Sequence, residues 1–377
     1  MKNILITGGL GFIGTHMAMK LITKGYKLTI LDNLSEQIHG TDPMNTSASL
    51  SLLKDKVTFI RGSVTSIKDW TVAIKNQQII LHLAAETGTG QSMYQIEKYI
   101  DVNIKGTGLV LDLLANSKHS IEQLVIASSR SIYGEGKYNS PEYGIVYPDA
   151  RLAVDLDNSD FELKYKDSSP LTLMPTDEDS KIHPSSVYGI TKQNQEQLVL
   201  TVSKALKIKG VALRYQNVYG PGQSLSNPYT GILSIFSTQI KNGNDINIFE
   251  DGLESRDFVF VEDVVDATIL AMENNEAEGK VFNVGSGQPT NVLTVAKTLA
   301  SAYKIAVNIN ITGNYRLGDI RHNYADLSLI KKTLGFTPKW SFEAGIKAFV
   351  NWVNKQEVEQ DNYAESIKEM KDRGLYK

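Results

Sequence analysis

The residues with the clearest potential for chemistry are a tyrosine and a lysine four positions apart, Tyr188 and Lys192. On a helix, positions i and i+4 share one face, so the phenol and the ammonium group become neighbours. A positive charge beside a phenol favours the phenolate and lowers a pKa that is ordinarily about 10. The spacing therefore predicts a tyrosine that exchanges protons with a sugar or alcohol hydroxyl near neutral pH. Taken alone, the pair is equally compatible with a solvated helix face.

A glycine-rich loop near the start of the chain indicates that a nucleotide takes part. An apolar run at residues 4–6 is typical of a strand buried on both faces, and Gly8, Gly11 and Gly14 follow it. The first glycine permits a tight turn, the second lets backbone approach a pyrophosphate, and the third lets the next helix pack closely. A helix expected at residues 12–24 would point its first N–H groups at the phosphates.

An acidic residue selects between the two nicotinamide cofactors. The second expected strand, residues 27–31, is followed by Asp32 and then by Asn33, with no arginine directly after the acid. A carboxylate at this strand end accepts hydrogen bonds from a ribose 2′-OH and repels a 2′-phosphate. The sequence therefore predicts NAD rather than NADP.

Composition excludes several classes of protein. With 377 residues, 41% of them hydrophobic, the chain can form one large α/β domain or two closely joined ones. A net charge of −3 without a basic block argues against a nucleic-acid partner. The chain has no cysteine, which excludes disulfides, thiol nucleophiles and zinc–cysteine sites and fits a reducing cytoplasm. No signal peptide or membrane-spanning run is visible, so we expect a cytoplasmic protein without a membrane partner.

The elements that must position these residues alternate in a regular rhythm. Strand-like and helical stretches alternate up to about residue 130, which predicts a Rossmann-type, doubly wound parallel sheet. We expect residues 1–210 to form the NAD-binding domain and residues 211–377 to form mainly a smaller α/β substrate-binding lobe, interleaved with the first. A helix at residues 101–116 should pack near the Tyr188 helix. Residues 134–183 break the rhythm, and such an insert is usually functional or loosely ordered.

Seven motifs in order resemble the extended short-chain dehydrogenase/reductase superfamily, in its nucleotide-sugar epimerase/dehydratase branch, and the likeness covers residues 1–350. The matching segments are residues 7–14, 82–85, 101–107, 128–134, 188–192, 256–264 and 282–287. Within this likeness, residues 90–94, 175–179, 225–231 and 249–252 resemble a subset, the dTDP-L-rhamnose 4-epimerases. Relatives often place cysteine pairs in the insert, but this chain has none, so no metal site carries over.

The resemblance implies roles for individual residues. Tyr188 would be the acid/base, Lys192 would bind the nicotinamide ribose and tune the tyrosine, and Ser129 would hydrogen-bond the reacting hydroxyl. The residues expected to bind the cofactor are Gly8, Gly11, Phe12, Ile13, Gly14, Asp32, Asn33, Ser63, Val64, Leu83, Ala84, Ala85, Asn103, Ser128, Tyr188, Lys192 and Tyr215. Those expected to bind substrate are Glu86, Thr87, Ser129, Ser131, Asn217, Arg256 and Arg316. The two arginines are included because a guanidinium matches a diphosphate.

The reaction type follows from what the chain lacks. Family dehydratases carry Asp-Glu directly after the position of Ser129, and decarboxylating members keep a Glu at the second of these positions. This chain has Arg130 and Ser131 there. Family reductase/3,5-epimerases use a cysteine, which is also absent.

Another departure is Ser63, which stands where the family usually has Asp and would contact adenine as a weaker acceptor.

We therefore predict an NAD-dependent nucleotide-sugar 4-epimerase, an isomerase that inverts C4 through a 4-keto intermediate. Its predicted substrate is dTDP-L-rhamnose or a related 6-deoxyhexose, which would point to polysaccharide biosynthesis. The resemblance also implies a homodimer built on the helices at residues 101–116 and 188–207. The open alternatives are another nucleotide-sugar epimerase, a dehydratase or oxidoreductase, and a non-catalytic NAD-binding sensor.

Overall fold

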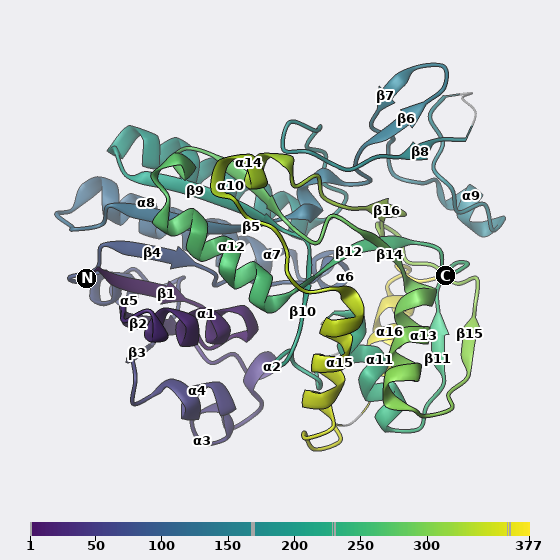
Figure 1. Ribbon diagram of the computed structural model, residues 1–377, viewed down its shortest axis with the longest axis horizontal. Coiled ribbons are helices and arrows are strands. Elements are labelled where there is room, and N and C mark those ends of the chain that lie inside the picture. Colours follow the sequence, from purple (N-terminus) through teal and green to yellow (C-terminus); the bar gives the residue numbers. More distant parts are fainter. Residues whose placement is uncertain (1, 167–169, 228, 230, 360, 362) are drawn as a thin grey trace.

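A seven-stranded, wholly parallel sheet forms the larger part of the molecule (Figure 1). The computed structural model describes residues 2–166, 170–227, 229, 231–359, 361 and 363–377; Pro228 and Thr230, within one resembling segment, lie outside them. The strand order is β13-β9-β5-β4-β1-β2-β3. The strands are β1 (Asn3–Thr7), β2 (Lys27–Asp32), β3 (Thr58–Arg61), β4 (Ile79–His82), β5 (Gln123–Ser129), β9 (Lys209–Tyr215) and β13 (Val281–Val284). The predicted Rossmann-type sheet is thus confirmed, with its order reversing between β1 and β4.

Helices cover both faces of this sheet because side chains alternate along each buried strand. Ile4 and Ile6 pack on one face with α1 (Phe12–Thr23), α12 (Val261–Glu273) and α14 (Ser328–Leu334). Leu5 packs on the other face with α5 (Ile67–Ala73), α8 (Gly106–Asn116) and α10 (Val187–Leu206). Short helices α2 (Glu36–His39), α3 (Pro43–Thr46), α4 (Ala48–Leu53), α6 (Thr89–Ser92) and α7 (Ile96–Tyr99) lie in the connections.

The helix predicted at residues 101–116 differs at its start. Residues Ile100–Lys105 form a π-helix, and the α-helical part begins at Gly106. Such wider turns occur mostly where a side chain has a special task. Here the turn carries Asn103, which is described below. As predicted, α8 packs against α10.

The second lobe has its own sheets and core. Strands β10 (Asn217–Tyr219), β12 (Ser255–Phe260), β14 (Pro289–Asn291) and β16 (His322–Asn323) form one sheet, and β11 (Ile246–Ile248) pairs with β15 (Ile309–Ile311). They pack with α11 (Ile232–Lys241), α13 (Val292–Tyr303) and α15 (Phe342–Val353). Because β9 and β13 lie in the large sheet, the chain crosses between the two parts more than once. The division at residue 210 stays a prediction, and it falls inside β9.

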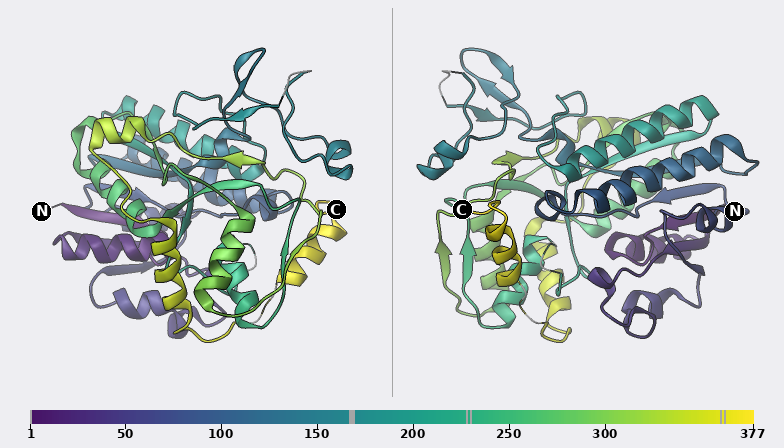
Figure 2. Two further views of the ribbon diagram at one scale, coloured as in Figure 1. Left: turned by 45° about the vertical axis from the view of Figure 1, so that its right-hand side comes forward. Right: turned by 180° about the vertical axis from the view of Figure 1, so that it is seen from behind.

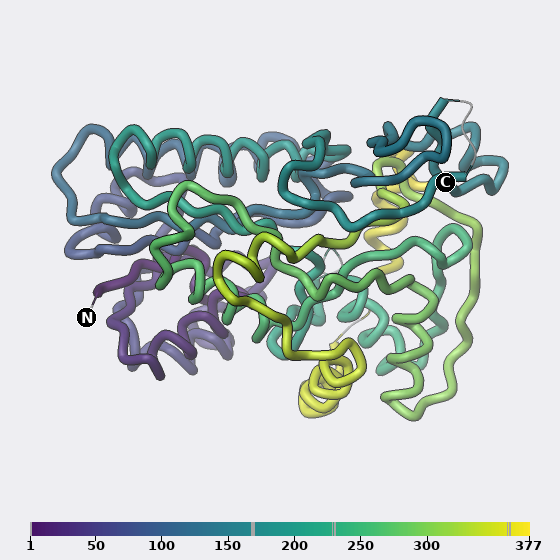
Figure 3. Tube along the Cα trace, turned by 45° about the horizontal axis from the view of Figure 1, so that its top comes forward, coloured from purple at the N-terminus to yellow at the C-terminus, as the bar shows by residue number. Residues whose placement is uncertain are grey.

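The described part of the insert is a small packed unit. Strands β6 (Tyr138–Ser140), β7 (Gly144–Val146) and β8 (Thr172–Leu173) form a sheet, and α9 (Ala153–Asp157) lies in the connection from β7 to β8. Arg151 donates to both carboxylate oxygens of Glu250, at 2.7 and 2.8 Å, which ties the insert to the second lobe. Figure 3 shows the insert close to the C-terminus and far from the N-terminus. In the part of the chain that the structure describes, no helix has the length and hydropathy needed to cross a bilayer.

Candidate active site

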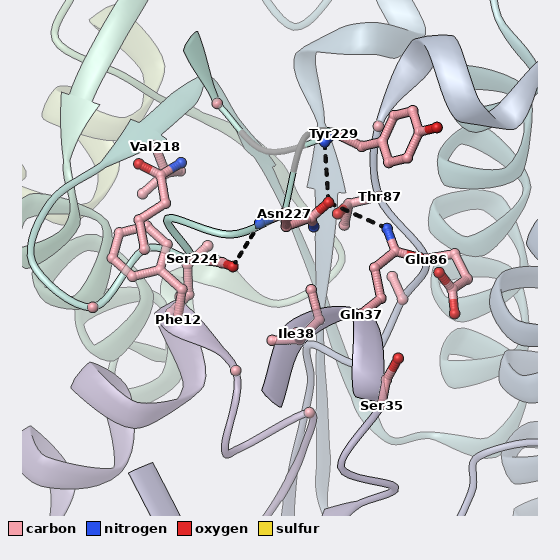
Figure 4. A pocket seen from close by; sticks show the side chains of 18 of the residues that line it. Phe12, Ser35, Gln37, Ile38, Glu86, Thr87, Val218, Ser224, Asn227 and Tyr229 are labelled. Carbon is pink, nitrogen blue, oxygen red and sulfur yellow. Dashed lines mark hydrogen bonds between the residues drawn. The ribbon is translucent and has the colours of Figure 1, made fainter. Parts of the chain in front are cut away.

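A cavity of about 1550 Å³ lies where the large sheet meets the second lobe. Its wall includes the glycine loop, the carboxyl ends of β2, β4 and β5, the start of α10, and residues of β12 and of the segment after β15. Ligands bind at such strand ends in doubly wound folds. Figure 4 shows one stretch of this wall, where Gln37 of α2 donates to Asn227 at 3.4 Å and so joins the two parts of the molecule.

The glycine loop can take only glycine at two positions. Gly8 has a φ of +66°, and a Cβ there would lie 2.8 Å from the backbone nitrogen of Ala84. At Gly14 a Cβ would lie 2.3 Å from the carbonyl oxygen of Gly8. Asp32 accepts from the backbone N–H of Leu10 and of Leu34, both at 2.9 Å, and thereby holds the loop. The glycine loop and the N–H groups in the first turn of α1 together form a site that fits a dinucleotide pyrophosphate.

The structure brings most of the predicted cofactor residues to this cavity. The wall includes Gly8, Gly11, Phe12, Ile13, Gly14, Asp32, Asn33, Ser63, Val64, Leu83, Ala84, Ala85, Ser128, Tyr188, Lys192 and Tyr215. The hydroxyl of Ser63 contacts that of Thr65 at 2.8 Å and accepts from its N–H at 3.1 Å. The Ser63 hydroxyl therefore already makes hydrogen bonds within its own turn, which makes it a weak acceptor for the adenine base.

Asn103 is the exception among the predicted cofactor residues, because it does not line the cavity. It is fully buried in the π-helical turn, and its side-chain oxygen accepts from the N–H of Glu86 at 2.8 Å. Its amide nitrogen donates to the carbonyl of Glu86 and to the hydroxyl of Thr191, at 3.1 and 2.9 Å. With its amide engaged in this way, Asn103 positions the Glu86 loop against α10.

The three predicted catalytic residues line the same cavity wall. Ser129 ends β5, and its hydroxyl accepts from the N–H of Ser131 at 3.2 Å and from its hydroxyl at 2.9 Å. Tyr188 lies in the first turn of α10, where Ser186 caps the helix by accepting from Gly189 at 3.1 Å. Lys192 follows one turn later and is buried.

The electrostatics of Tyr188 differ from those that the Tyr–Lys spacing predicts. Burial raises the pKa of Tyr188, while the hydroxyl of Ser129 and the charge of Arg130 act to lower it. Lys192 donates instead to the side-chain oxygen of Gln195 at 2.7 Å, and burial lowers the pKa of Lys192 to about 7. The prediction of a lowered Tyr188 pKa is therefore wrong for this structure, because desolvation of a buried phenol outweighs the nearby charge.

Arg130 is one site residue that sequence reasoning missed, since it served there only as evidence of an absent carboxylate. It directly follows Ser129 and lines the cavity. Its guanidinium makes no hydrogen bond or ion pair with any residue that the structure describes. Burial and the charge of Arg256 lower the pKa of Arg130 to about 9, while Asp319 acts in the opposite direction. The available signal was its position at the carboxyl end of a central parallel strand, where ligands bind.

We expect Arg130→Met to move the pH dependence of turnover. The charge of Arg130 lowers the pKa of Tyr188, so its removal raises that pKa and shifts the limb that requires the phenolate to higher pH. The measurement is kcat/KM against pH for the wild type, Arg130→Met and Arg130→Lys. The lysine variant keeps the charge and should lie near the wild type; coincident limbs for all three proteins would contradict the role.

The predicted substrate residues also line the cavity, and their side chains differ in the partners that they have. Glu86, Thr87, Ser129, Ser131, Asn217, Arg256 and Arg316 all line the cavity. Arg256 donates to the carbonyls of Ile320 and Arg321 at 2.6 and 2.9 Å, and no described carboxylate pairs with it. Arg316 pairs with Asp319 at 2.7 Å. The side-chain oxygen of Asn217 is buried without a partner among the described residues. An uncompensated guanidinium suits a diphosphate.

Comparisons with known proteins agree with this geometry. A family model, the NAD dependent epimerase/dehydratase family, matches residues 4–151 and 164–285. The dTDP-L-rhamnose 4-epimerase of Burkholderia thailandensis is 37% identical over 364 residues, which cover 96% of this chain and 97% of the relative. The UDP-glucose 4-epimerase of Thermotoga maritima, solved with UDP-glucose, is 29% identical with a TM-score of 0.74, covering 94% of this chain and 99% of that one. MoeE5, solved with UDP-glucuronic acid and NAD, is 26% identical with a TM-score of 0.73 and the same coverage.

Proposed function

Because this chain belongs to the NAD-dependent epimerase/dehydratase family, we propose that it is an NAD-dependent 4-epimerase of a nucleotide sugar, acting on dTDP-L-rhamnose or a related 6-deoxyhexose. The observation that carries the proposal is the meeting of three features in one cavity. These are a glycine cradle for a dinucleotide, the Ser129–Tyr188 pair, and two arginines for a diphosphate. The 37% identity with a dTDP-L-rhamnose 4-epimerase over nearly the whole chain supports the choice of sugar.

The chain's own residues supply binding and proton transfer. NAD⁺, which the glycine loop and Asp32 would hold, would supply reversible hydride transfer at C4 of the sugar. Tyr188 takes the proton from the C4 hydroxyl and later returns it, while Ser129 orients that hydroxyl. Arg256 and Arg316 hold the diphosphate, so that the sugar can turn about its phosphate linkage. The net result is inversion at C4 without net oxidation.

Two alternatives lose support at the same wall. A dehydratase needs carboxylates beside the sugar, and Arg130 and Ser131 stand at the two positions where its relatives carry them. A non-catalytic NAD-binding protein has no use for the proton-transfer pair, which this chain keeps in the cavity. A net oxidoreductase keeps the same residues and is separated only by experiment.

The test is NMR of the purified protein with dTDP-L-rhamnose and no added cofactor. We expect a mixture of the substrate and its C4 epimer, which requires a retained NAD⁺. No epimer, with NADH accumulating once NAD⁺ is supplied, would identify a net dehydrogenase. No change under either condition, repeated with UDP- and GDP-sugars, would contradict the proposal.

We also propose a homodimer built on α10 and on the predicted helix at residues 101–116, which α7 and the π-helical turn extend at its start. These elements pack together, yet Ile96, Ile100 and Ile190 are 48%, 44% and 46% exposed. Large apolar side chains gathered on neighbouring helices are typical of an interface. Sedimentation of the wild type should give a dimer and that of Ile100→Lys a monomer; a monomeric wild type would overturn this proposal.

A further inference from the structure

The end of the chain, residues 363–377, lies against the substrate side of the cavity. Its helix α16 (Tyr363–Asp372) is the yellow helix in Figure 2. Tyr363 and Met370 line the same cavity as Tyr188 and Arg316. None of the motifs described in the sequence analysis lies in this segment.

The last residues of the chain pair with the segment that carries Arg316. The N–H of Tyr315 donates to the carbonyl of Lys377 at 2.9 Å, and the N–H of Lys377 donates back at 3.1 Å. Leu317 donates to Leu375 at 3.0 Å, so Arg316 lies opposite Tyr376 in an antiparallel bridge. The chain end therefore fixes the backbone on both sides of Arg316, a residue predicted to bind the diphosphate.

The helix itself reaches across to the larger part of the molecule. Met370 is buried, and a Cβ at Gly90 would lie 3.5 Å from its sulfur. The hydroxyl of Tyr94 donates to Glu369 at 3.1 Å, and the hydroxyl of Tyr229 donates to the same carboxylate. Glu86 and Thr87 line the wall just before α6, which contains Gly90, so α16 connects the two sides of the substrate end.

Tyr363 offers the cavity a free hydrogen-bond donor. It is the first residue of α16, and the charges of Arg316 and Asp319 act on its phenol. Burial raises the pKa of Tyr363 to about 12, so the phenol keeps its proton at neutral pH. Its hydroxyl has no hydrogen-bond partner among the residues that the structure describes. A protonated phenol beside a guanidinium is suited to a phosphate oxygen, which accepts both kinds of donor.

We propose that the C-terminal segment is part of the substrate site, with the hydroxyl of Tyr363 donating to the diphosphate of a nucleoside diphosphate beside Arg316. The inference rests on the proposed function for the choice of ligand. In this arrangement α16 closes the cavity over the diphosphate and restricts solvent access to the sugar. The free hydroxyl, the antiparallel pairing around Arg316 and the contacts of Met370 and Glu369 all support it.

The first test is calorimetric titration of dTDP, without a sugar, into the wild type and Tyr363→Phe. A lost hydrogen bond to a charged group should weaken dTDP binding roughly 10-fold. Tyr143→Phe removes a hydroxyl from an exposed tyrosine of the insert and is the matched control, expected to bind like the wild type. Equal dTDP affinity in all three proteins, with equal thermal unfolding, would overturn the role of Tyr363.

A second variant tests the closure. Glu369→Ala removes the acceptor shared by Tyr94 and Tyr229 and should loosen α16 without touching the diphosphate. We expect weaker dTDP binding and faster proteolysis after residue 355, with NAD content unchanged. Wild-type dTDP affinity together with a wild-type rate of proteolysis would overturn the proposed closure by α16. Because dTDP binding needs no turnover, weakened binding in a protein that fails to epimerise would support this inference and contradict only the proposed reaction. Full epimerisation with undiminished dTDP binding in Tyr363→Phe would support the proposed reaction and contradict the role of Tyr363.

Discussion

Replacing Tyr188 with phenylalanine is expected to lower kcat about a thousandfold. The substitution removes the phenolic oxygen that is proposed to exchange the proton, while the ring and its contact with Tyr99, at 6.4 Å between centroids, are preserved. General acid–base catalysis contributes roughly 10²–10⁴ to a rate, and the buried site supplies no ready substitute from solvent. The measurement is the rate of C4 inversion by NMR at saturating nucleotide sugar.

If Tyr188 is the acid/base, the loss of kcat in Tyr188→Phe must come from the lost proton transfer and not from a change in structure. Tyr188→Phe should keep the NAD content and the dTDP affinity of the wild type, because neither the glycine loop nor the arginines change. KM should therefore move little while kcat falls. A variant with full turnover would remove Tyr188 from the mechanism and leave Ser129 or Arg130 to be tested as the proton-transfer group.

The largest effect on stability is expected from Arg214→Met. Arg214 of β9 donates to both carboxylate oxygens of Glu196 on α10, at 3.0 and 2.6 Å, and both side chains are buried. Its third nitrogen donates to the hydroxyl of Tyr133 at 2.7 Å. Removal of one partner leaves an unpaired buried charge, which costs about 3–5 kcal/mol. Urea unfolding of the wild type and the variant measures the difference in free energy of unfolding.

Two further variants separate the lost pair from a general loss of packing. The double variant Arg214→Met with Glu196→Gln removes both charges and should recover much of the stability. Lys2→Met breaks an ion pair whose side chains are about half exposed and should cost at most about 1 kcal/mol. An Arg214→Met protein as stable as Lys2→Met would show that the buried pair contributes little.

The buried pair also connects stability with the site. Glu196 lies one turn beyond Lys192 on α10, and it accepts a hydrogen bond from Ser128 at 2.6 Å. Ser128 precedes Ser129 at the end of β5. The pair thus fixes the helix that carries Tyr188 against the strand that carries its hydroxyl partner, a task that the sequence pattern did not reveal.

The sequence alone determined those features that depend on neighbouring residues. The glycine spacing, the apolar strands, Asp32 and the i,i+4 pair at Tyr188 are local signals, because backbone sterics and helical periodicity act over a few positions. They predicted the parallel sheet, and the family resemblance named candidate site residues that, apart from Asn103, all line the cavity. They did not predict Asn103 as a buried support, because its role depends on a π-helical turn and on partners far along the chain.

Only the tertiary structure decided the electrostatics and the closure of the site. The pKa of Tyr188 depends on how deeply the phenol is buried and on Arg130, which enters the cavity from another element. The last residues of the chain acquire a role only because they pair with the segment of Arg316, about sixty positions earlier in the chain. Burial and long-range pairing are properties of the assembled molecule, since desolvation and contact between distant segments exist only once the chain has folded.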